Sequence, residues 1–177
     1  PQGRYENIRL ENGPLLINNT EYSLTIIATD LGGNERIRVI EKVIYDDILP
    51  EFSITKPQSG TFINSTTLTY VLSEKLIQGV ITWEPVDPTR GNPIKVILKE
   101  NEMDSGSFDD IIFENQTELI DGILYNLSIE AYDRAENRLS VLLSDSITYD
   151  ITPPDFIDIA PEAGSYLNSA IVKFTNS

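Results

Sequence analysis

The 177-residue sequence contains no cysteine and no histidine. Without either residue type, disulfides and the usual zinc, copper, haem and iron–sulfur ligands are excluded. The absence of histidine also removes the Ser-His-Asp and Cys-His nucleophile arrangements and the usual base near neutral pH. A phosphate-cradling glycine loop is missing too, since the only adjacent glycines are Gly32 and Gly33. We therefore expect a protein that is not an enzyme.

Basic residues are scarce as well. The chain has 13 Lys and Arg against 28 Asp and Glu, which gives a net charge of -15. Such a surface repels phosphate backbones and anionic lipid and favours divalent cations, so we expect no nucleic-acid partner. Apolar runs of about 20 residues are absent, which predicts no direct membrane insertion. The sequence opens without an initiator Met or a signal peptide, and we expect an internal piece of a longer protein.

What the sequence does contain is an internal repeat. Residues 4–34 align without a gap with residues 107–137, so that "YSLTIIATD" matches "YNLSIEAYD", and residues 46–65 align with 150–169. The period of about 104 residues is the size of a domain, which indicates a tandem array of whole modules. We expect residues 1–48 to be the C-terminal half of one module, 49–152 a complete module and 153–177 the start of a third.

The complete module has the pattern of a β protein. Seven stretches alternate between apolar and polar residues: "FSIT", "TLTYVLS", "VITW", "IKVILKE", "FDDIIFE", "YNLSIEAYD" and "RLSVLLSDSITYD". Asp145 interrupts the last of them, which indicates a β-bulge or a strand that changes sheets. Seven short strands in about 100 residues predict an all-β, Ig-like or fibronectin type III-like sandwich.

One motif sharpens this expectation. In "LIDGILYNLSIEAYD", Leu119, Gly122 and Tyr125 follow a three-residue spacing, which resembles the tyrosine corner of Ig-like and fibronectin type III modules. The earlier copy has Asn19 in the glycine position, where asparagine also tolerates a left-handed backbone. Together with "YDITPP", the chain resembles the tandem Ig-like repeats of large bacterial cell-surface proteins and adhesins. That resemblance implies an extracellular location, at the cell surface or secreted.

The predicted topology gathers acidic residues at the end of the module where the chain enters. In a seven-strand sandwich, the loops after the second, fourth and sixth strands lie at that end. These loops and the entering linker carry Asp46, Asp47, Glu51, Glu74, Glu100, Glu102, Asp104, Asp133, Glu136 and Asn137. The candidate ligands for a Ca²⁺ ion at the module junction are Asp46, Asp47, Asp104, Asp133 and Asn137. Ordinary solvated turns are the alternative, because Asp and Asn are common turn residues.

Three other patterns have a functional and a structural interpretation. Trp83 could stack on a sugar, but its strand pattern favours the sandwich core. The pairs Asp109/Asp110 and Glu100/Glu102 could serve a glycosidase, but they lie on or beside one strand. Asn-x-Ser/Thr sequences occur at Asn18, Asn64, Asn115 and Asn126, against about two expected from composition, and this excess is weak evidence for glycosylation.

Two functions remain open at this level. The first is a non-catalytic structural or adhesive module of an extracellular stalk, fibre or coat, whose partners are neighbouring modules or other copies in a fibre. The alternative is a ligand- or carbohydrate-binding accessory module of a secreted enzyme, which would bind a surface ligand or glycan. An exposed aromatic patch would favour the second, and Tyr132 is the main aromatic residue that the strand pattern points outward.

Overall fold

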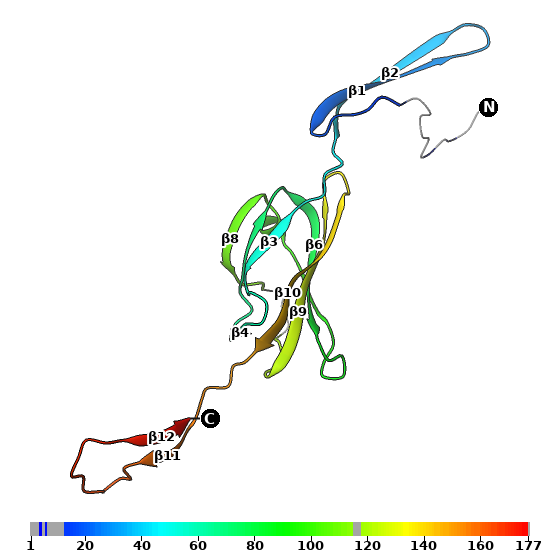
Figure 1. Cartoon of the computed structure of the whole chain (residues 1–177). Helices are drawn as coiled ribbons and strands as arrows, with labels where there is room; N and C mark the ends of the chain where they lie inside the picture. Colours follow the sequence, from blue (N-terminus) through cyan, green and yellow to red (C-terminus); the bar gives the residue numbers. More distant parts are fainter. Residues whose placement is uncertain (1–3, 5, 7–12, 115–117, 177) are drawn as a thin grey trace.

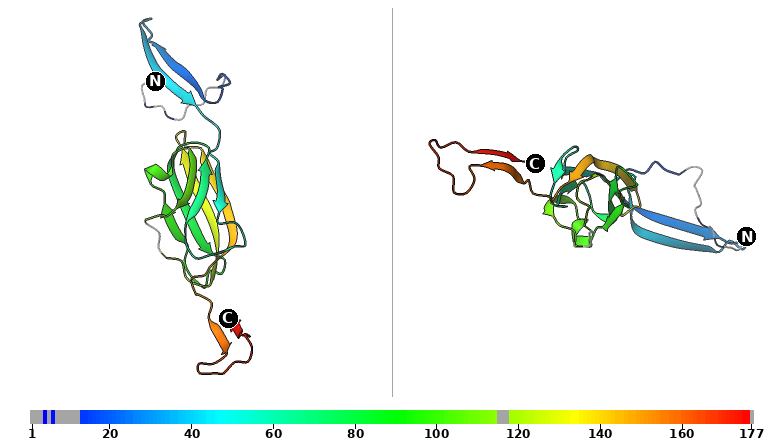
Figure 2. Two further views of the ribbon diagram at one scale, coloured as in Figure 1. Left: turned by 90° about the vertical axis from the view of Figure 1, so that its left-hand side faces the viewer. Right: turned by 90° about the horizontal axis from the view of Figure 1, so that it is seen from below.

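The computed structural model describes residues 4, 6, 13–114 and 118–176, and it is all-β apart from one short 3-10 turn within those residues. A central sandwich lies between two hairpins, which project from its opposite ends (Figures 1 and 2). The prediction of an all-β fold is therefore confirmed.

The central sandwich comprises eight strands and the 3-10 turn. The strands are β3 (Phe52–Lys56), β4 (Phe62–Ile63), β5 (Leu68–Leu72), β6 (Leu76–Pro85), β7 (Ile94–Ile97), β8 (Gly106–Ile111), β9 (Ile123–Asp133) and β10 (Arg138–Tyr149), and the 3-10 turn η1 is Glu100–Glu102. One sheet has the order β3-β5-β8 and the other the order β4-β10-β9-β6-β7. Every neighbouring pair is antiparallel except β4 with β10.

The two outer hairpins are β1 (Thr20–Thr29) with β2 (Glu35–Tyr45) and β11 (Phe156–Ala160) with β12 (Lys173–Asn176). Both pairs are antiparallel. The segment aligned with "FDDIIFE", residues 5–11, lies outside the described residues except for residue 6.

Alternating side chains build the core of the sandwich. In β9, buried residues alternate with more exposed ones along the whole strand, as the period-two pattern predicted. Trp83 of β6 is fully buried, and its ring meets that of Tyr125 edge-on at 6.4 Å. The predicted core position of Trp83 is therefore confirmed.

The seven stretches predicted as strands all contain strands. The eighth strand, β4, is an addition, and its two residues pair with Thr148 and Tyr149 of β10. Two residues are too few to display an alternating pattern, so the sequence carried no signal for β4.

The β1–β2 and β9–β10 hairpins share a bulge at equivalent positions. Their registers shift just after Tyr22 in β1 and just after Tyr125 in β9. The bulged strands contain Lys42 at φ 60° and Ser146 at φ 54°, both in the left-handed region. The bulge predicted next to Asp145 is confirmed, and the earlier hairpin has the same irregularity.

Tyr125 forms the predicted corner. Its side chain is fully buried, and its hydroxyl oxygen accepts a hydrogen bond from the backbone amide of Ile120 at 2.9 Å. The bond ties β9 to the segment that precedes it.

The earlier hairpin repeats this bond. The amide of Ile17 donates to the hydroxyl of Tyr22 at 2.7 Å. Asn19 has φ 54° where Gly122 has φ 67°, so asparagine does adopt the left-handed conformation there.

We predict that Tyr125→Phe lowers the free energy of unfolding of the sandwich by about 1 kcal/mol, because the buried Tyr125 loses its hydrogen bond with the Ile120 amide. Urea denaturation followed by the fluorescence of Trp83, the single tryptophan, measures this directly. Tyr132→Phe is the matched control, since the Tyr132 hydroxyl donates only to Glu130 at the surface. Equal midpoints for all three proteins would contradict the role given to the corner.

Candidate functional site

Three carboxylates meet where the linker enters the sandwich. Asp46 lies in the linker after β2, Glu74 between β5 and β6, and Asp133 at the end of β9. One carboxylate oxygen from each lies within 4.8 Å of the others. Asp133 is fully buried, and the other two are partly buried. The structure thus brings together two of the candidate ligands, Asp46 and Asp133, and adds Glu74; we call these three residues the acidic junction.

Hydrogen bonds fix the buried member of the acidic junction. Asp133 Oδ1 accepts from the amides of Ala135 at 2.8 Å and Asn137 at 2.9 Å, and its Oδ2 accepts from Asn137 Nδ2 at 2.8 Å. Asn137 Nδ2 also donates to the backbone oxygen of Asp46 at 3.2 Å, where the β9–β10 turn reaches the linker (Figure 1). Asn137 therefore connects the turn to the linker as a hydrogen-bond donor.

The β1–β2 turn has the same network. Asp30 Oδ1 accepts from the amides of Gly32 and Asn34 at 2.9 and 2.8 Å, and its Oδ2 accepts from Asn34 Nδ2 at 2.9 Å. These bonds, led by the Asn34 side chain, lower the pKa of Asp30. The Asp-x-x-x-Asn pattern is thus a turn motif in both hairpins. What distinguishes the turn at Asp133 is the approach of two further carboxylates.

Those neighbours act on Glu74. Its pKa is raised, first by desolvation and then by the negative charges of Asp133 and Asp46. Within the described residues, no hydrogen bond reaches the Glu74 carboxylate. Ionised Glu74 therefore opposes the docking of the linker, and a cation would reverse that effect. Three carboxylates with added waters suit Ca²⁺, which takes six to eight oxygens, so a calcium ion here remains a prediction.

Of the other three candidate ligands, Asn137 contacts Asp133 and Asp46 as a hydrogen-bond donor, whereas Asp104 and Asp47 lie outside the acidic junction. Asp104 pairs with Lys75, its Oδ1 lying 2.8 Å from Nζ. Asp47 turns toward the preceding hairpin, where it accepts a hydrogen bond from the Tyr45 hydroxyl at 3.0 Å. Lys75 therefore binds Asp104, and Tyr45 binds Asp47. The predicted loop positions gave no indication of either contact.

One member of each carboxylate pair considered for glycosidase chemistry has structural partners. Glu102 is buried, and its carboxylate accepts from the Lys99 amide at 2.7 Å, which closes the 3-10 turn. Asp110 lies 3.4 Å from the ammonium of Lys56 and accepts from Thr69 at 3.4 Å. Of the four glycosylation sequences, the one at Asn115 lies outside the described residues.

A contact that sequence reasoning missed holds the linker as it leaves each hairpin. After β2, Asn18 Oδ1 accepts from the Asp47 amide at 2.9 Å, and the Asn19 amide donates to the Tyr45 carbonyl at 2.8 Å. We call this pair of bonds the first exit clasp. It joins the residues just before β1 to those just after β2.

The second exit clasp uses the equivalent residues after β10. Asp121 Oδ1 accepts from the Ile151 amide at 2.7 Å, and the Gly122 amide donates to the Tyr149 carbonyl at 2.8 Å. A third bond is added, because Thr152 Oγ1 donates to Asp121 Oδ2 at 2.7 Å. The Thr152 hydroxyl, followed by the Ile151 amide, lowers the pKa of Asp121.

The clasps explain a difference between the two linkers. "YDITPP" has Thr152 where "YDDILP" has Ile48, and an isoleucine cannot donate the third bond. The residue that accepts these hydrogen bonds also differs: it is Asp121 in the copy with Thr152 and Asn18 in the copy with Ile48. This paired difference was the sequence signal that could have pointed to the contact.

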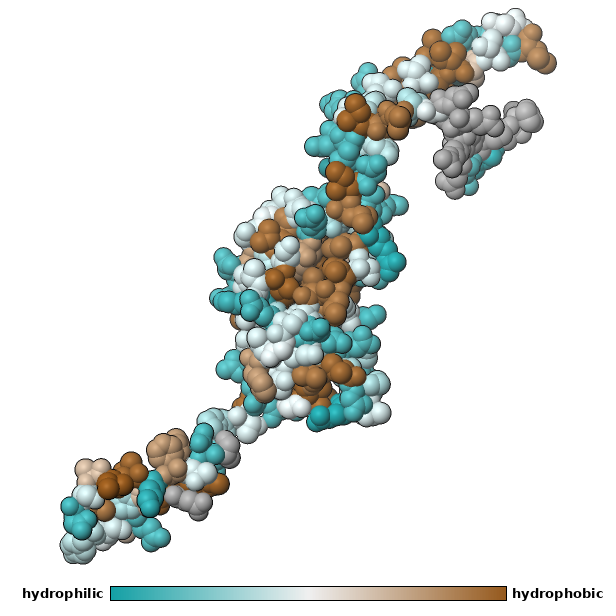
Figure 3. Space-filling view, viewed as in Figure 1, coloured by the Kyte–Doolittle hydropathy of each residue, from teal (hydrophilic) through white to brown (hydrophobic). Residues whose placement is uncertain are grey.

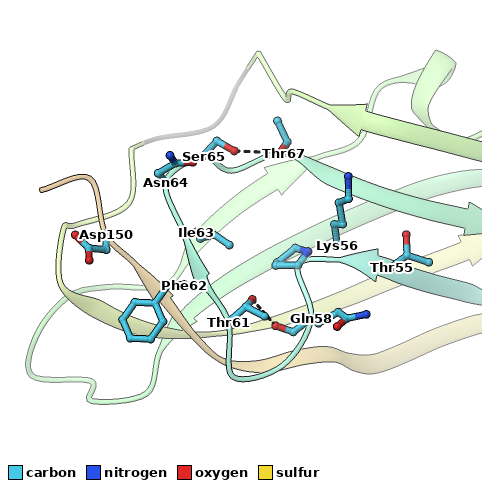
Figure 4. Close-up of a pocket in the computed structure, with 11 residues that line it drawn as sticks. Thr55, Lys56, Gln58, Thr61, Phe62, Ile63, Asn64, Ser65, Thr67 and Asp150 are labelled. Carbon is cyan, nitrogen blue, oxygen red and sulfur yellow. Dashed lines mark hydrogen bonds between the residues drawn. The ribbon is translucent and has the colours of Figure 1, made fainter. Parts of the chain in front are cut away.

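An open groove of about 680 Å³ lies at the end of the sandwich where the chain leaves β10, opposite the acidic junction (Figure 4). It is lined by residues between Thr55 and Thr67, most of them polar, together with Asp150. Phe62 is 73% exposed, whereas Tyr132, the aromatic expected at the surface, is partly buried. The strongly exposed aromatic residue of the sandwich is thus Phe62, on the short strand that the sequence did not reveal.

Comparison of the chain with protein-family models finds no match, and comparison with curated proteins finds no significant one. Among the described residues, no helix has the length and apolar character needed to cross a membrane. Function is therefore argued from the geometry of the junctions.

We predict that Glu74→Gln raises the melting temperature in chelator at neutral pH. A carboxylate with a raised folded-state pKa costs stability as the pH rises from its unfolded value through its folded value, and the neutral amide removes that cost. The gain should not exceed about 1 kcal/mol at such a partly exposed site. Millimolar Ca²⁺ should then raise the melting temperature of the parent protein and leave that of Glu74→Gln unchanged, as differential scanning calorimetry measures.

Asp104→Asn is the control for this experiment, because Asp104 pairs with Lys75 away from the acidic junction. It should keep the full calcium response. No response in the parent protein would mean that the acidic junction is a solvated turn. Asp133→Ala is a poorer probe, because it also removes the hydrogen bonds that hold the β9–β10 turn.

The second exit clasp should loosen at acid pH. Because the Asp121 pKa is lowered from 3.8, its contribution is present above that value and is lost as the pH falls through the lowered pKa. We predict that the Ile151 amide resonance titrates with a midpoint below 3.8. In Asp121→Asn, which copies the first clasp, this titration should disappear. A midpoint at or above the ordinary value in the parent protein would contradict the clasp.

Proposed function

We propose that the chain is a non-catalytic segment of a tandem Ig-like array, which serves as a stalk, fibre or coat at the cell surface. Its task in this proposal is to hold successive modules in line at a defined spacing. The single observation that carries the proposal is the exit clasp, which recurs at equivalent residues after β2 and after β10.

The topology of the sandwich supports the Ig-like part of the proposal. If β3, β5 and β8 are strands A, B and E, the other sheet reads A′-G-F-C-C′ from β4 to β7. This division of strands between the sheets is that of Ig-like sandwiches. The buried Trp83 on the strand in the C position and the corner at Tyr125 on the strand in the F position also fit it.

The hairpins support the repeat. β1–β2 and β9–β10 share a corner tyrosine, a bulge, an Asp-x-x-x-Asn turn and a clasp. These features involve backbone and side chains together, and they support the repeat more strongly than a shared strand pattern would.

The clasps suit a spacer because their hydrogen bonds join residues before the first strand of a hairpin to the linker after its second strand. Each one fixes the first residues of the linker onto the folded unit, which shortens the length of chain that can bend. Prolines at Pro50, Pro153 and Pro154 restrict much of the remainder. The extended arrangement in Figures 1 and 2 is the one that such linkers favour.

A second candidate function is a glycan-binding accessory module, favoured by the exposed Phe62 beside the groove. Apolar rings on a polar groove suit sugar faces, but binding sites use several placed polar groups around a deeper cleft. Glycan-array binding that is lost in Phe62→Ala would support this function. If the parent protein binds no glycan, the accessory-module function is contradicted and only the structural function remains.

Distance measurements between spin labels test the spacer proposal. Because the chain has no cysteine, Arg36→Cys with Lys95→Cys places one label on β2 and one on β7 without interference. At low protein concentration we predict a narrow distance distribution by pulsed electron paramagnetic resonance. Asn18→Ala should broaden it, because the linker loses the first clasp.

Asp87→Ala is the control for the label experiment. Asp87 holds only its own turn between β6 and β7, through Thr89. It should leave the distribution unchanged. A distribution in the parent protein as broad as that of Asn18→Ala would count against a spacer held by clasps.

A further inference from the structure

The asparagines of the Asn-x-Ser/Thr sequences differ in what their side chains do. Asn18 Oδ1 accepts from the Asp47 amide in the first exit clasp. Asn126 Oδ1 accepts from the Ser146 amide at 3.2 Å. The Asn64 side chain is exposed, and no hydrogen bond reaches it from the part of the chain that the structure describes. Because sugars are attached to the amide nitrogen of such a sequence, Asn64 is the acceptor whose side chain the described residues do not engage.

An ordinary turn role does not account for Asn64, which lies in a bend directly after β4. At turns, Asn and Asp side chains typically accept a hydrogen bond from the backbone amide two residues on. Asp46, Asp87 and Asp150 all do so in this chain. Asn64 accepts no such bond within the described residues, so its side chain has no turn-forming task there.

The hydroxyl that completes the acceptor sequence is also unengaged. Thr66 stands two residues after Asn64 and is partly buried. Its neighbours Ser65 and Thr67 hydrogen-bond to each other, with their hydroxyl oxygens 3.1 Å apart (Figure 4). Among the described residues, none forms a hydrogen bond with the Thr66 hydroxyl. A substitution of Thr66 therefore changes the acceptor sequence without removing a hydrogen bond between those residues.

Phe62 lies beside the Asn64 amide. Figure 4 shows Phe62 and Asn64 on one side of the chain and Ile63 on the other, as the alternation along a strand requires. Ile63 packs against the core, whereas the Phe62 ring is 73% exposed. A single exposed ring is ordinary at a protein surface. Its position two residues before an acceptor amide gives this ring a use, because the apolar face of an attached sugar can pack on it and remove apolar surface of both from water.

The surroundings of Asn64 suit a hydrated sugar. The groove of about 680 Å³ that Asn64 lines also contains Lys56, Gln58 and Asp150, which offer hydrogen-bond donors and acceptors. On the face shown in Figure 3, polar and apolar side chains are interspersed at the end of the sandwich where the chain leaves it. A continuous apolar patch would favour a docked protein, whereas this mixed surface favours a sugar.

We propose that Asn64 is an N-glycosylation site and that the first sugar of the glycan packs on the Phe62 ring. In the transfer, Asn64 Nδ2 forms a bond to the anomeric carbon of the sugar and loses one proton to a base of the transferase. The bond from that carbon to the phosphate of a lipid-linked sugar donor breaks, and the lipid phosphate leaves with the electron pair. The proposal rests on the extracellular location proposed above, because sequences of this type are modified in secreted proteins.

The following repeat provides a natural comparison. Its Tyr166 and Asn168 occupy the positions of the ring and of the acceptor, but Ala170 stands in place of the threonine. Without that hydroxyl, Asn168 should carry no sugar. Ala170→Thr completes an Asn-Ser-Thr sequence and should create a second site there.

Glycopeptide mass spectrometry of the protein purified from its natural source tests the site. The peptide that contains Asn64 should carry the mass of a sugar, and the peptide that contains Asn168 should not. An Asn64 peptide found only in its unmodified form would overturn the proposal.

Secretion of the 177-residue chain from a eukaryotic host tests the acceptor separately from the natural location. The parent chain and Thr66→Ser, which keeps the hydroxyl, should be modified at Asn64, whereas Thr66→Ala should not. If Asn64 is modified in this host and not in the natural source, the failure lies in the cellular location or its transferase. If it is modified in neither, the failure lies in the acceptor. The spacer function is tested independently by the label experiment on unmodified protein.

Melting temperatures of the secreted proteins, followed by the fluorescence of Trp83, test the packing on Phe62. The difference between the parent protein and Thr66→Ala isolates the glycan at Asn64, because both carry the same sugars elsewhere. It should be about 2 °C or more, which is the size of shift that one surface contact produces in a domain of this length. In the Phe62→Ala background the difference should vanish. The same four proteins from a host without the transferase provide the baseline for the two substitutions. An equal difference with and without the Phe62 ring would overturn the packing.

Discussion

The hydrogen bond from the Ile120 amide to the buried hydroxyl of Tyr125 is the constraint on which the rest of this structure depends. It anchors the turn that precedes β9 to the core. That turn carries Asp121 and Gly122, which bind the chain again after β10. A core residue thereby determines where the linker leaves the module. The same sequence of contacts starts from Tyr22 in the preceding hairpin.

At the end of the module where the chain enters, charge repulsion opposes the docking of the linker. The exit clasps attract the linker, whereas the acidic junction places Asp46 beside Glu74 and Asp133. Asn137 offsets part of that repulsion by donating to the Asp46 carbonyl. We therefore predict that entry of the chain responds to charge and to cations, while directed hydrogen bonds hold its exit.

Much of the fold was predictable because it depends on local pattern. Alternation gave the strands, and the spacing around Tyr125 gave its corner. The two-residue strand β4 was missed because it has no period. The acidic junction was predicted only in part: loop topology placed Asp46 and Asp133 together, but Lys75 draws Asp104 away. The clasp depends on Asp121 meeting residues some thirty positions later, which no local pattern encodes.

Hydrogen exchange of the Ile151 amide in Tyr125→Phe tests most directly whether the corner controls the exit of the chain. Protection is compared with that of core amides, so that a general loss of stability is separated from a local one. The account predicts that the Ile151 amide loses more protection than the core does, while the Asp47 amide at the first clasp is unchanged. Equal loss at Ile151 and in the core would show that the corner stabilises the sandwich without positioning the linker.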